Sequence, residues 1–122
     1  MTFAIQNALL YPERHPGVDE SLNFNDSLNL QFYPPDLSRY PCLKLAGDAL
    51  LQGGLAPLVF NAANEIAVAA FLSNRIGFGL ISSIIESTLN LFDYQSAHSI
   101  EDLLSQDQIA RKLAQKEVLS SP

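Results

Sequence analysis

The fold of this chain is decided by residues 55–72, which read LAPLVFNAANEIAVAAFL. One set of residues in this run recurs at three-and-four spacing, as on a helix face that packs against a core: Phe60, Ala63, Asn64, Ala67, Val68 and Phe71. The pentapeptide at 61–65 adds two amides and one carboxylate, and each costs about 1–3 kcal/mol if it is buried without a hydrogen-bond partner. The pattern predicts a helix from near Pro57 to Ser73–Asn74 whose polar side chains need specific partners.

A second helix is predicted upstream, over residues 41–52. Pro41 stands at an early helical position, where its missing N–H is harmless, and Gly53-Gly54 supplies a left-handed stop. Gly47 lies in the helix interior, where glycine costs about 1 kcal/mol relative to alanine. We expect the inner face of this helix to consist of Leu43, Ala46, Ala49 and Leu50.

Two further helices are predicted in the last third of the chain. The first carries an unbroken apolar stripe at helical spacing: Ile81, Ile84, Ile85, Thr88, Leu89 and Phe92. The last begins at Ser99, whose hydroxyl can cap it while Asp102 forms an imperfect capping box, and a restart at Asp107 is an alternative. Its expected inner face is Ile109, Ala110, Leu113, Ala114 and Val118. Four amphipathic helices with short connections predict a small four-helix bundle over residues 40–122.

The first 39 residues differ in character, because prolines and clustered Asn and Asp separate short apolar pieces. Phe3 to Leu9 predicts a short helix that stops before Pro12. Leu28, Leu30 and Phe32 alternate as in a half-buried strand, and Leu22 with Phe24 suggests a second strand. A lone two-stranded ribbon is only marginally stable, so these strands need partners outside the chain. We expect a mainly α protein: an extended arm with one or two short strands at 1–39, then the bundle domain.

Composition limits the function. A net charge of −6 and a pI near 4.6 argue against binding to nucleic acid or an anionic membrane, because no basic patch exists to neutralise phosphates. The sequence has no uninterrupted apolar run long enough to span a bilayer and no basic-then-apolar leader, so we expect a cytoplasmic protein. Cys42 is the single cysteine; a small core residue is the favoured interpretation, and a reactive thiol is the alternative.

Asn61, Asn64 and Glu65 are the candidate site residues. An amide pair with a carboxylate could hold a substrate hydroxyl or a metal, although Asn is a weak ligand and no histidine or second acid lies within a turn. The favoured alternative is structural: the side chains bond backbone groups at neighbouring helix ends or at an interdomain seam. No catalytic, cofactor-binding or metal-ligating residue is therefore assigned, and Pro41, Asn61, Asn64 and Glu65 are taken as a structural signature.

Two other features have ordinary explanations. Gly53-Gly54 precedes a helix start but lacks the Lys and Ser or Thr of a phosphate loop, so a turn is expected. His15 and His98 stand in loops without a second metal ligand at a diagnostic spacing, so surface positions are expected.

A series of short motifs runs in order through nearly the whole chain: Tyr11-Pro12-Glu13-Arg14, Leu30-Gln31-Phe32, Pro35-Asp36, Tyr40 to Ala46, Gly53-Gly54, Ala56-Pro57, Asn61 to Glu65, Ala67-Val68, Phe71-Leu72 and Ile76-Gly77-Phe78. In this order they resemble the C-terminal region of 1-deoxy-D-xylulose 5-phosphate reductoisomerase. Members of that family are roughly three times longer and form 2-C-methyl-D-erythritol 4-phosphate in the methylerythritol phosphate pathway to isoprenoids.

The resemblance implies a division of labour between domains. NADPH and a divalent metal, Mg or Mn, would be bound by the N-terminal and central domains, which this chain lacks, and the full-length enzyme would be a homodimer. The chain alone would be an inactive structural support reached through its arm. Two alternatives remain open: a stand-alone helical interaction module without catalysis, and a small autonomous enzyme that uses Asn61, Glu65 and a histidine.

Overall fold

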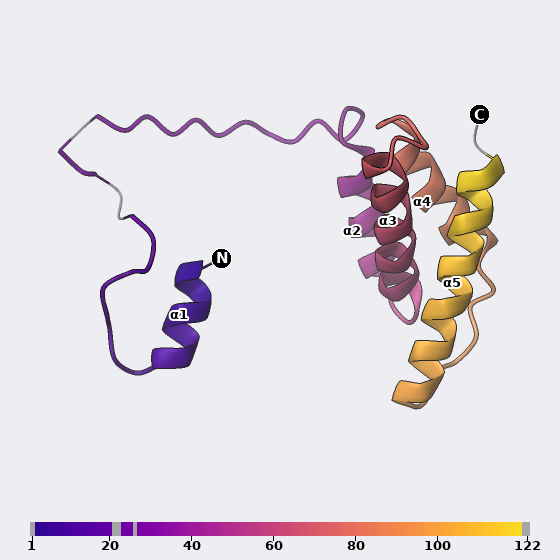
Figure 1. The fold of residues 1–122 in the computed structure, drawn as a ribbon. Coiled ribbons are helices and arrows are strands. Elements are labelled where there is room, and N and C mark those ends of the chain that lie inside the picture. Colours follow the sequence, from indigo (N-terminus) through magenta and orange to yellow (C-terminus); the bar gives the residue numbers. More distant parts are fainter. Residues whose placement is uncertain (1, 21–22, 26, 121–122) are drawn as a thin grey trace. The chain divides into compact units, whose positions relative to one another are not determined.

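The computed structural model describes residues 2–20, 23–25 and 27–120, and it divides the chain into two compact units, Met1–Pro34 and Pro35–Pro122 (Figure 1). The first unit holds α1 (Thr2–Leu10). The second holds α2 (Pro41–Gln52), α3 (Ala56–Leu72), α4 (Leu80–Leu91) and α5 (Ile100–Ser120). The mainly α prediction is confirmed. Among the described residues, no helix has the length and apolar character needed to cross a membrane.

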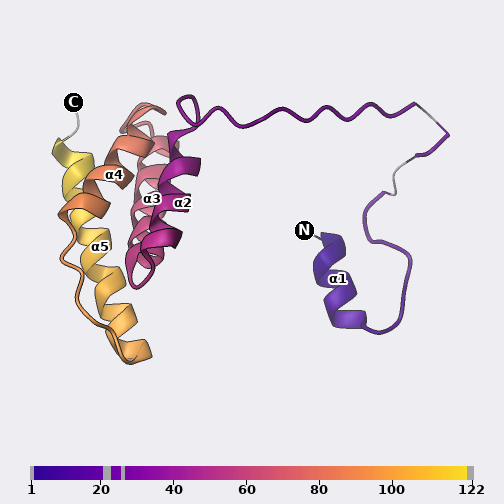
Figure 2. The same cartoon turned by 180° about the vertical axis from the view of Figure 1, so that it is seen from behind.

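α3 is the helix around which the larger unit is built. It packs against α2, α4 and α5, and Figures 1 and 2 both show α2 and α5 on opposite sides of it. Its inward side chains are small, and several have no exposed surface: Ala56, Val59, Ala62, Ala63, Ala67 and Ala70. The distance between packed helices depends on the side chains at their contact. The methyl groups of α3 therefore allow its neighbours to approach closely.

Larger residues from the neighbouring helices complete the core in two clusters. In the first, isoleucines of α4 meet small residues of α5 beside the alanines of α3: Ile81, Ile84, Ile85, Ala114 and Val118. The second gathers near the start of α3: Leu55, Val59, Ala62, Phe92 and Ala110. Thr88 of α4 is fully buried. Its hydroxyl donates a 2.7 Å hydrogen bond to the carbonyl of Ile84. Its polar atom is thus satisfied within its own helix.

Local signals set the helix boundaries. α2 begins at Pro41 and ends where Gly53 takes a φ of 70° and donates its N–H to the carbonyl of Ala49 at 3.1 Å. At the start of α5, the Asp102 N–H donates to the Ser99 hydroxyl at 3.0 Å, and the Ser99 N–H donates to the Asp102 carboxylate at 3.1 Å. The predicted capping box is confirmed. α5 then continues through Asp107 without a restart.

The predicted inner face of α2 is partly wrong. Leu43 is 52% exposed and Leu50 is 74% exposed, whereas Ala49 is buried and Cys42 and Leu45 pack against the first cluster. α2 is apolar on more than one side, so periodicity alone does not choose between its faces. It packs only on α3 and α4 within the described residues, and this leaves the leucines of its other side uncovered.

The first unit is a short helix with a loop folded against it. Gln6 holds the two together: its side-chain N–H donates to the carbonyl of Pro16 at 2.7 Å, and its side-chain oxygen accepts from the N–H of Val18 at 3.2 Å. α1 has no buried residue. The predicted short helix is confirmed, but it contributes no core of its own.

The prediction of strands in the arm is not supported by the described residues. Residues 23–25 and 27–34 contain no strand, and Leu28, Leu30 and Phe32 are 54%, 78% and 90% exposed. Leu22, part of the second expected strand, lies outside the described residues. A strand is defined by hydrogen bonds to a neighbour, and none is available within the described ranges. The alternating sequence pattern carries no information about whether that neighbour is present.

Gly47 and Gly53 give opposite predictions for the same substitution. A Cβ at Gly47 would meet no atom within 4 Å inside α2, so Gly47→Ala should raise the free energy of unfolding by about 0.5–1 kcal/mol. Gly53 has a φ of 70°, so Gly53→Ala should lower it by about 1 kcal/mol or more. Urea unfolding followed by circular dichroism measures both, and the same sign for the two variants would contradict the assignment.

Candidate functional site

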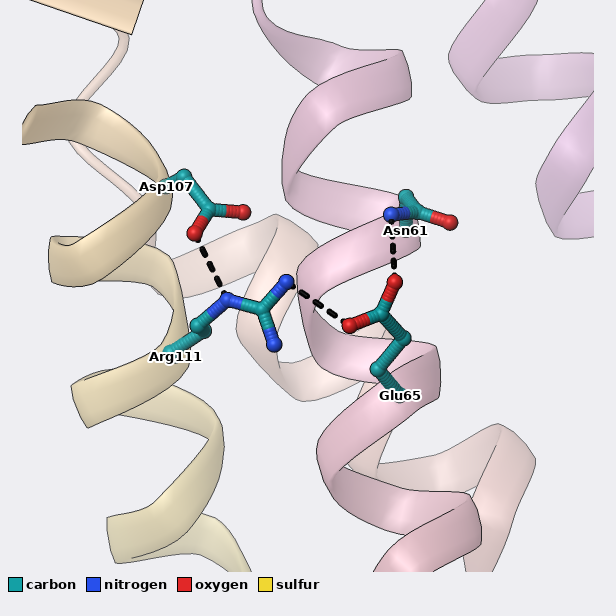
Figure 3. Close-up of polar contacts among 4 residues, drawn as sticks. All are labelled: Asn61, Glu65, Asp107 and Arg111. Carbon is teal, nitrogen blue, oxygen red and sulfur yellow. Dashed lines mark hydrogen bonds and ion pairs between the residues drawn. The ribbon is translucent and has the colours of Figure 1, made fainter. Parts of the chain in front are cut away.

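The polar residues of α3 meet α5 in a chain of side-chain contacts, shown in Figure 3. Asn61 Nδ2 donates to Glu65 Oε1 at 3.0 Å, and Glu65 Oε2 lies 2.8 Å from Arg111 Nη2. Arg111 Nε donates to Asp107 Oδ2 at 2.6 Å. We call these four residues, Asn61, Glu65, Asp107 and Arg111, the α3–α5 clamp.

The clamp lies at the edge of the core rather than inside it. The side chains of Arg111 and Asp107 are 32% and 27% exposed, and that of Glu65 is 52% exposed. The hydrogen bond from Arg111, followed by that from Asn61, lowers the pKa of the Glu65 carboxyl. The bonds to Asp107 and then Glu65 raise the pKa of the Arg111 guanidinium. Both shifts favour the ionised forms of Glu65 and Arg111.

This arrangement suits a link between helices better than a reactive site. One guanidinium pairs with both carboxylates, which favours a structural role for them over a role as general base or metal ligand. Across the described residues there is no group of three or more His, Cys, Asp and Glu side chains that could hold a metal ion. His98 is exposed outside the clamp, and His15 pairs with Glu13 at 3.2 Å in the other unit. Within the unit Pro35–Pro122, no hydrogen bond or ion pair joins His98 to Asn61 or Glu65.

The structural interpretation of Asn61 and Glu65 needs one correction. They were expected to bond backbone groups, but their side chains bond other side chains, because both residues stand on an exposed edge of α3. Asp107 and Arg111 were not identified as members of a site. Their spacing of four residues could have indicated their own pair, yet nothing in the sequence connects that pair to Glu65.

Asn64 lies on a different side of α3 and takes no part in the clamp. Its side chain is half-buried and makes no hydrogen bond to any described residue. With Pro41 and Cys42 from the start of α2, it lines an open groove of about 490 Å³. Burial raises the pKa of the Cys42 thiol, which favours a packing residue over a catalytic nucleophile.

The clamp predicts a pH-dependent contribution to stability. Arg111→Met should lower the melting temperature by a few degrees at pH 7, because it removes the ionic contacts and keeps the aliphatic stem. The folded-state pKa of Glu65 is lowered, so its contribution is fully present above the unfolded-state pKa of about 4.3 and is lost as the pH falls through the folded-state value. The difference between wild type and variant should therefore shrink towards pH 3.

Lys112→Met is the matched control. Lys112 is exposed on the same helix, and its substitution removes one positive charge, as Arg111→Met does. Thermal unfolding of the three proteins between about pH 3 and pH 7 provides the comparison. An equal loss for both variants, or a loss for Arg111→Met that does not change with pH, would contradict the role assigned to the clamp.

Comparison with known proteins gives a consistent picture over almost the full length of the chain. Residues 1–113 match the family model described as the DXP reductoisomerase C-terminal domain. The chain is 42% identical over 122 residues to the 1-deoxy-D-xylulose 5-phosphate reductoisomerase of Paraburkholderia xenovorans strain LB400, covering 100% of this chain and 30% of the relative. It is 43% identical over 120 residues to that of Acinetobacter baumannii strain ATCC 17978, covering 98% and 30%.

Solved structures agree with these sequence relatives. The structure of the Zymomonas mobilis reductoisomerase in complex with NADPH is similar with a TM-score of 0.85 at 41% identity, over 96% of this chain and 31% of that chain. A reductoisomerase in complex with magnesium is similar with a TM-score of 0.84 at 34% identity, over 97% and 32%. The chain thus spans about 30% of the length of the curated relatives it matches. It belongs to the DXP reductoisomerase C-terminal domain family.

Proposed function

We propose that this chain is the C-terminal structural domain of a 1-deoxy-D-xylulose 5-phosphate reductoisomerase. Joined to the rest of the enzyme, it would take part in forming 2-C-methyl-D-erythritol 4-phosphate with NADPH and a divalent metal, Mg or Mn, in isoprenoid biosynthesis. The observation that carries the proposal is the match to the C-terminal family model over residues 1–113. The similarity to a reductoisomerase structure with a TM-score of 0.85 supports it.

The residues of this chain do not fit the nucleotide or the metal. The described part offers no cluster of three metal-ligating side chains, and both carboxylates of the clamp already pair with Arg111. The Gly53 N–H donates to the carbonyl of Ala49 at the end of α2, so it is not available to bind a phosphate. Gly53-Gly54 therefore forms an ordinary turn. We therefore assign NADPH and metal binding to the missing N-terminal and central domains, and the reaction to those domains as well.

The role left to this chain is mechanical support. The alanine face of α3 and the clamp fix the relative positions of α3 and α5, while Pro41 starts α2. We assign Pro41, Asn61, Asn64 and Glu65 structural roles on this basis. Residues 40–122 form the supporting bundle domain, and residues 1–39 form the arm that connects it to the rest of a cytoplasmic, homodimeric enzyme.

The arm is proposed to complete a sheet of the missing domains. Its alternating side chains Leu28, Leu30 and Phe32 are exposed, and its backbone in residues 27–34 has no strand partner. An extended segment with unpaired backbone groups can add to the edge of a sheet in another domain. A sheet in the part of the enzyme outside this chain would explain both observations: the alternation of apolar residues in the arm, and their exposure when that sheet is absent.

Activity is tested in a chimera in which this chain replaces the matched region of the Paraburkholderia xenovorans enzyme. We expect the chimera to oxidise NADPH with 1-deoxy-D-xylulose 5-phosphate within about a hundredfold of the parent rate, which allows for a misplacement of about 1 Å at the seam. NADPH absorbance measures the rate.

The isolated chain and the parent enzyme truncated before the matched region are the controls, and neither should oxidise NADPH with this substrate. Turnover by the isolated chain would contradict its assignment as a support. A folded chimera without turnover, together with an inactive second chimera built on the Zymomonas mobilis enzyme, would overturn the proposed function.

The exposed arm predicts that the isolated chain associates. Light scattering at high protein concentration should report oligomers, because the apolar side chains of the arm are available to a second copy. The double variant Leu30→Lys and Phe32→Lys should shift the protein towards monomer. The matched control is Leu51→Lys, which changes an 87% exposed residue of α2. A monomeric wild-type chain at high concentration would contradict the prediction.

A further inference from the structure

A groove in the larger unit has a mixed apolar and polar lining that the proposed function does not use. The turn before α2, the start of α2, the middle of α3 and the start of α4 enclose a volume of about 490 Å³. Its walls include Tyr40, Cys42, Val68, Phe78 and Ile81. All of these elements belong to the unit Pro35–Pro122, so the groove is a feature of one compact body.

Large apolar side chains around the groove are uncovered. Phe78 is 75% exposed and Tyr40 is 53% exposed, and Leu43 on the adjoining side of α2 is 52% exposed. Phe78 is nevertheless held in place, because its ring meets that of Phe71 edge-to-face at 5.5 Å. Ordered aromatic rings at the border of an apolar groove are typical of surfaces that receive a partner.

The other rim of the groove is fixed by a turn. Asp36 Oδ1 accepts hydrogen bonds from the Ser38 N–H at 2.9 Å, the Ser38 hydroxyl at 2.6 Å and the Arg39 N–H at 3.2 Å. The Tyr40 N–H donates to the carbonyl of Asp36 at 2.9 Å. These bonds hold Arg39 and Tyr40 in position, so the groove does not need to reorganise when a partner enters.

Asn64 supplies a polar group inside this groove. Its half-buried amide lines the groove and has no hydrogen-bond partner among the described residues. A side-chain amide can donate and accept at once, which matches the N–H and C=O of a peptide backbone. Asn61, on the same helix, has Glu65 as its partner. The two asparagines of residues 61–65 are therefore in different environments, and only Asn64 is open to a backbone from outside.

Several segments that carry the family resemblance meet at this groove. Its lining includes Tyr40-Pro41-Cys42 at the start of α2, Asn64 and Val68 on α3, and Phe78 before α4. The chain spans only about 30% of the length of its relatives, so most of the enzyme lies outside it and must contact this domain somewhere. The length of the missing polypeptide and the chemistry of the groove point to an occupant within the same enzyme.

We propose that this groove receives an extended segment from the part of the reductoisomerase outside this chain, with one apolar side chain inserted between Tyr40 and Phe78 and a backbone group bonded to Asn64. The inference rests on the proposed function, because the occupant belongs to the same enzyme. It assigns Asn64 to an interdomain seam and Phe78 to its rim.

Cys42 lines the groove and provides a natural reporter of its occupancy, since it is the only cysteine of the chain. Iodoacetamide labelling, followed by mass spectrometry of the peptide that contains Cys42, is measured in the isolated chain and in the Paraburkholderia xenovorans chimera. We expect Cys42 to react in the isolated chain and to react at least about tenfold more slowly in the chimera. A tenfold change corresponds to the free energy of about one hydrogen bond.

Matched variants of the chimera test the two named side chains. Asn64→Ala should increase the labelling rate of Cys42 by about tenfold, the worth of one hydrogen bond, whereas Asn61→Ala should leave it within about twofold. Phe78→Asp should also increase the rate. Its control, Leu72→Asp, changes a residue of similar exposure, 73%, that does not line the groove.

A cysteine at Gln108 on α5 reports general shielding, because this exposed position lies outside the groove. Equal labelling of Cys42 in the isolated chain and the chimera would overturn the inference, as would an unreactive Cys42 in the isolated chain or equal protection at Gln108→Cys. Turnover is measured on the same samples. An active chimera with an unprotected Cys42 would refute the seam and leave the proposed function standing. A protected Cys42 in an inactive chimera would support the seam, and the proposed function would be overturned only if the Zymomonas mobilis chimera were inactive too.

Discussion

The close approach of helices to the alanine face of α3 is the constraint on which the rest of the larger unit depends. Ala63, Ala67 and Ala70 have no exposed surface, and α2, α4 and α5 all pack on this helix. Small side chains at a contact allow helix axes to lie close together, and the isoleucines of α4 pack into the core beside them. Every other feature, from the clamp to the groove, occupies the border of this packed centre.

The polar residues of α3 divide according to the side of the helix on which they stand. Asn61 bonds Glu65, and Glu65 pairs with Arg111 of α5 at the surface of the bundle. Asn64 faces the groove beside the start of α2, where the described chain gives it no hydrogen-bond partner. One pentapeptide therefore serves two purposes: a link inside the domain and, by our proposal, a link to the rest of the enzyme.

A supporting domain of a larger enzyme also accounts for what this chain leaves uncovered. The arm carries exposed Leu30 and Phe32, α2 carries exposed Leu50, and the groove is bordered by exposed Phe78. Burial of such side chains gains roughly 1.5–3 kcal/mol each, which favours association with a partner. The family to which the chain belongs supplies one, because its members are about three times as long as the matched region.

The sequence by itself determined the helices, because their signals are local. Apolar spacing fixed α4, the Ser99–Asp102 pair fixed the start of α5, and Gly53 fixed the end of α2. Tertiary structure alone decided which side of α2 is buried, that Arg111 meets Glu65, and that Asn64 is left open. Those outcomes depend on how helices distant in sequence are placed against one another. The alternating residues of the arm form no strand among the described residues, because a strand needs hydrogen bonds to a neighbouring strand. The sequence pattern does not show whether such a neighbour is present.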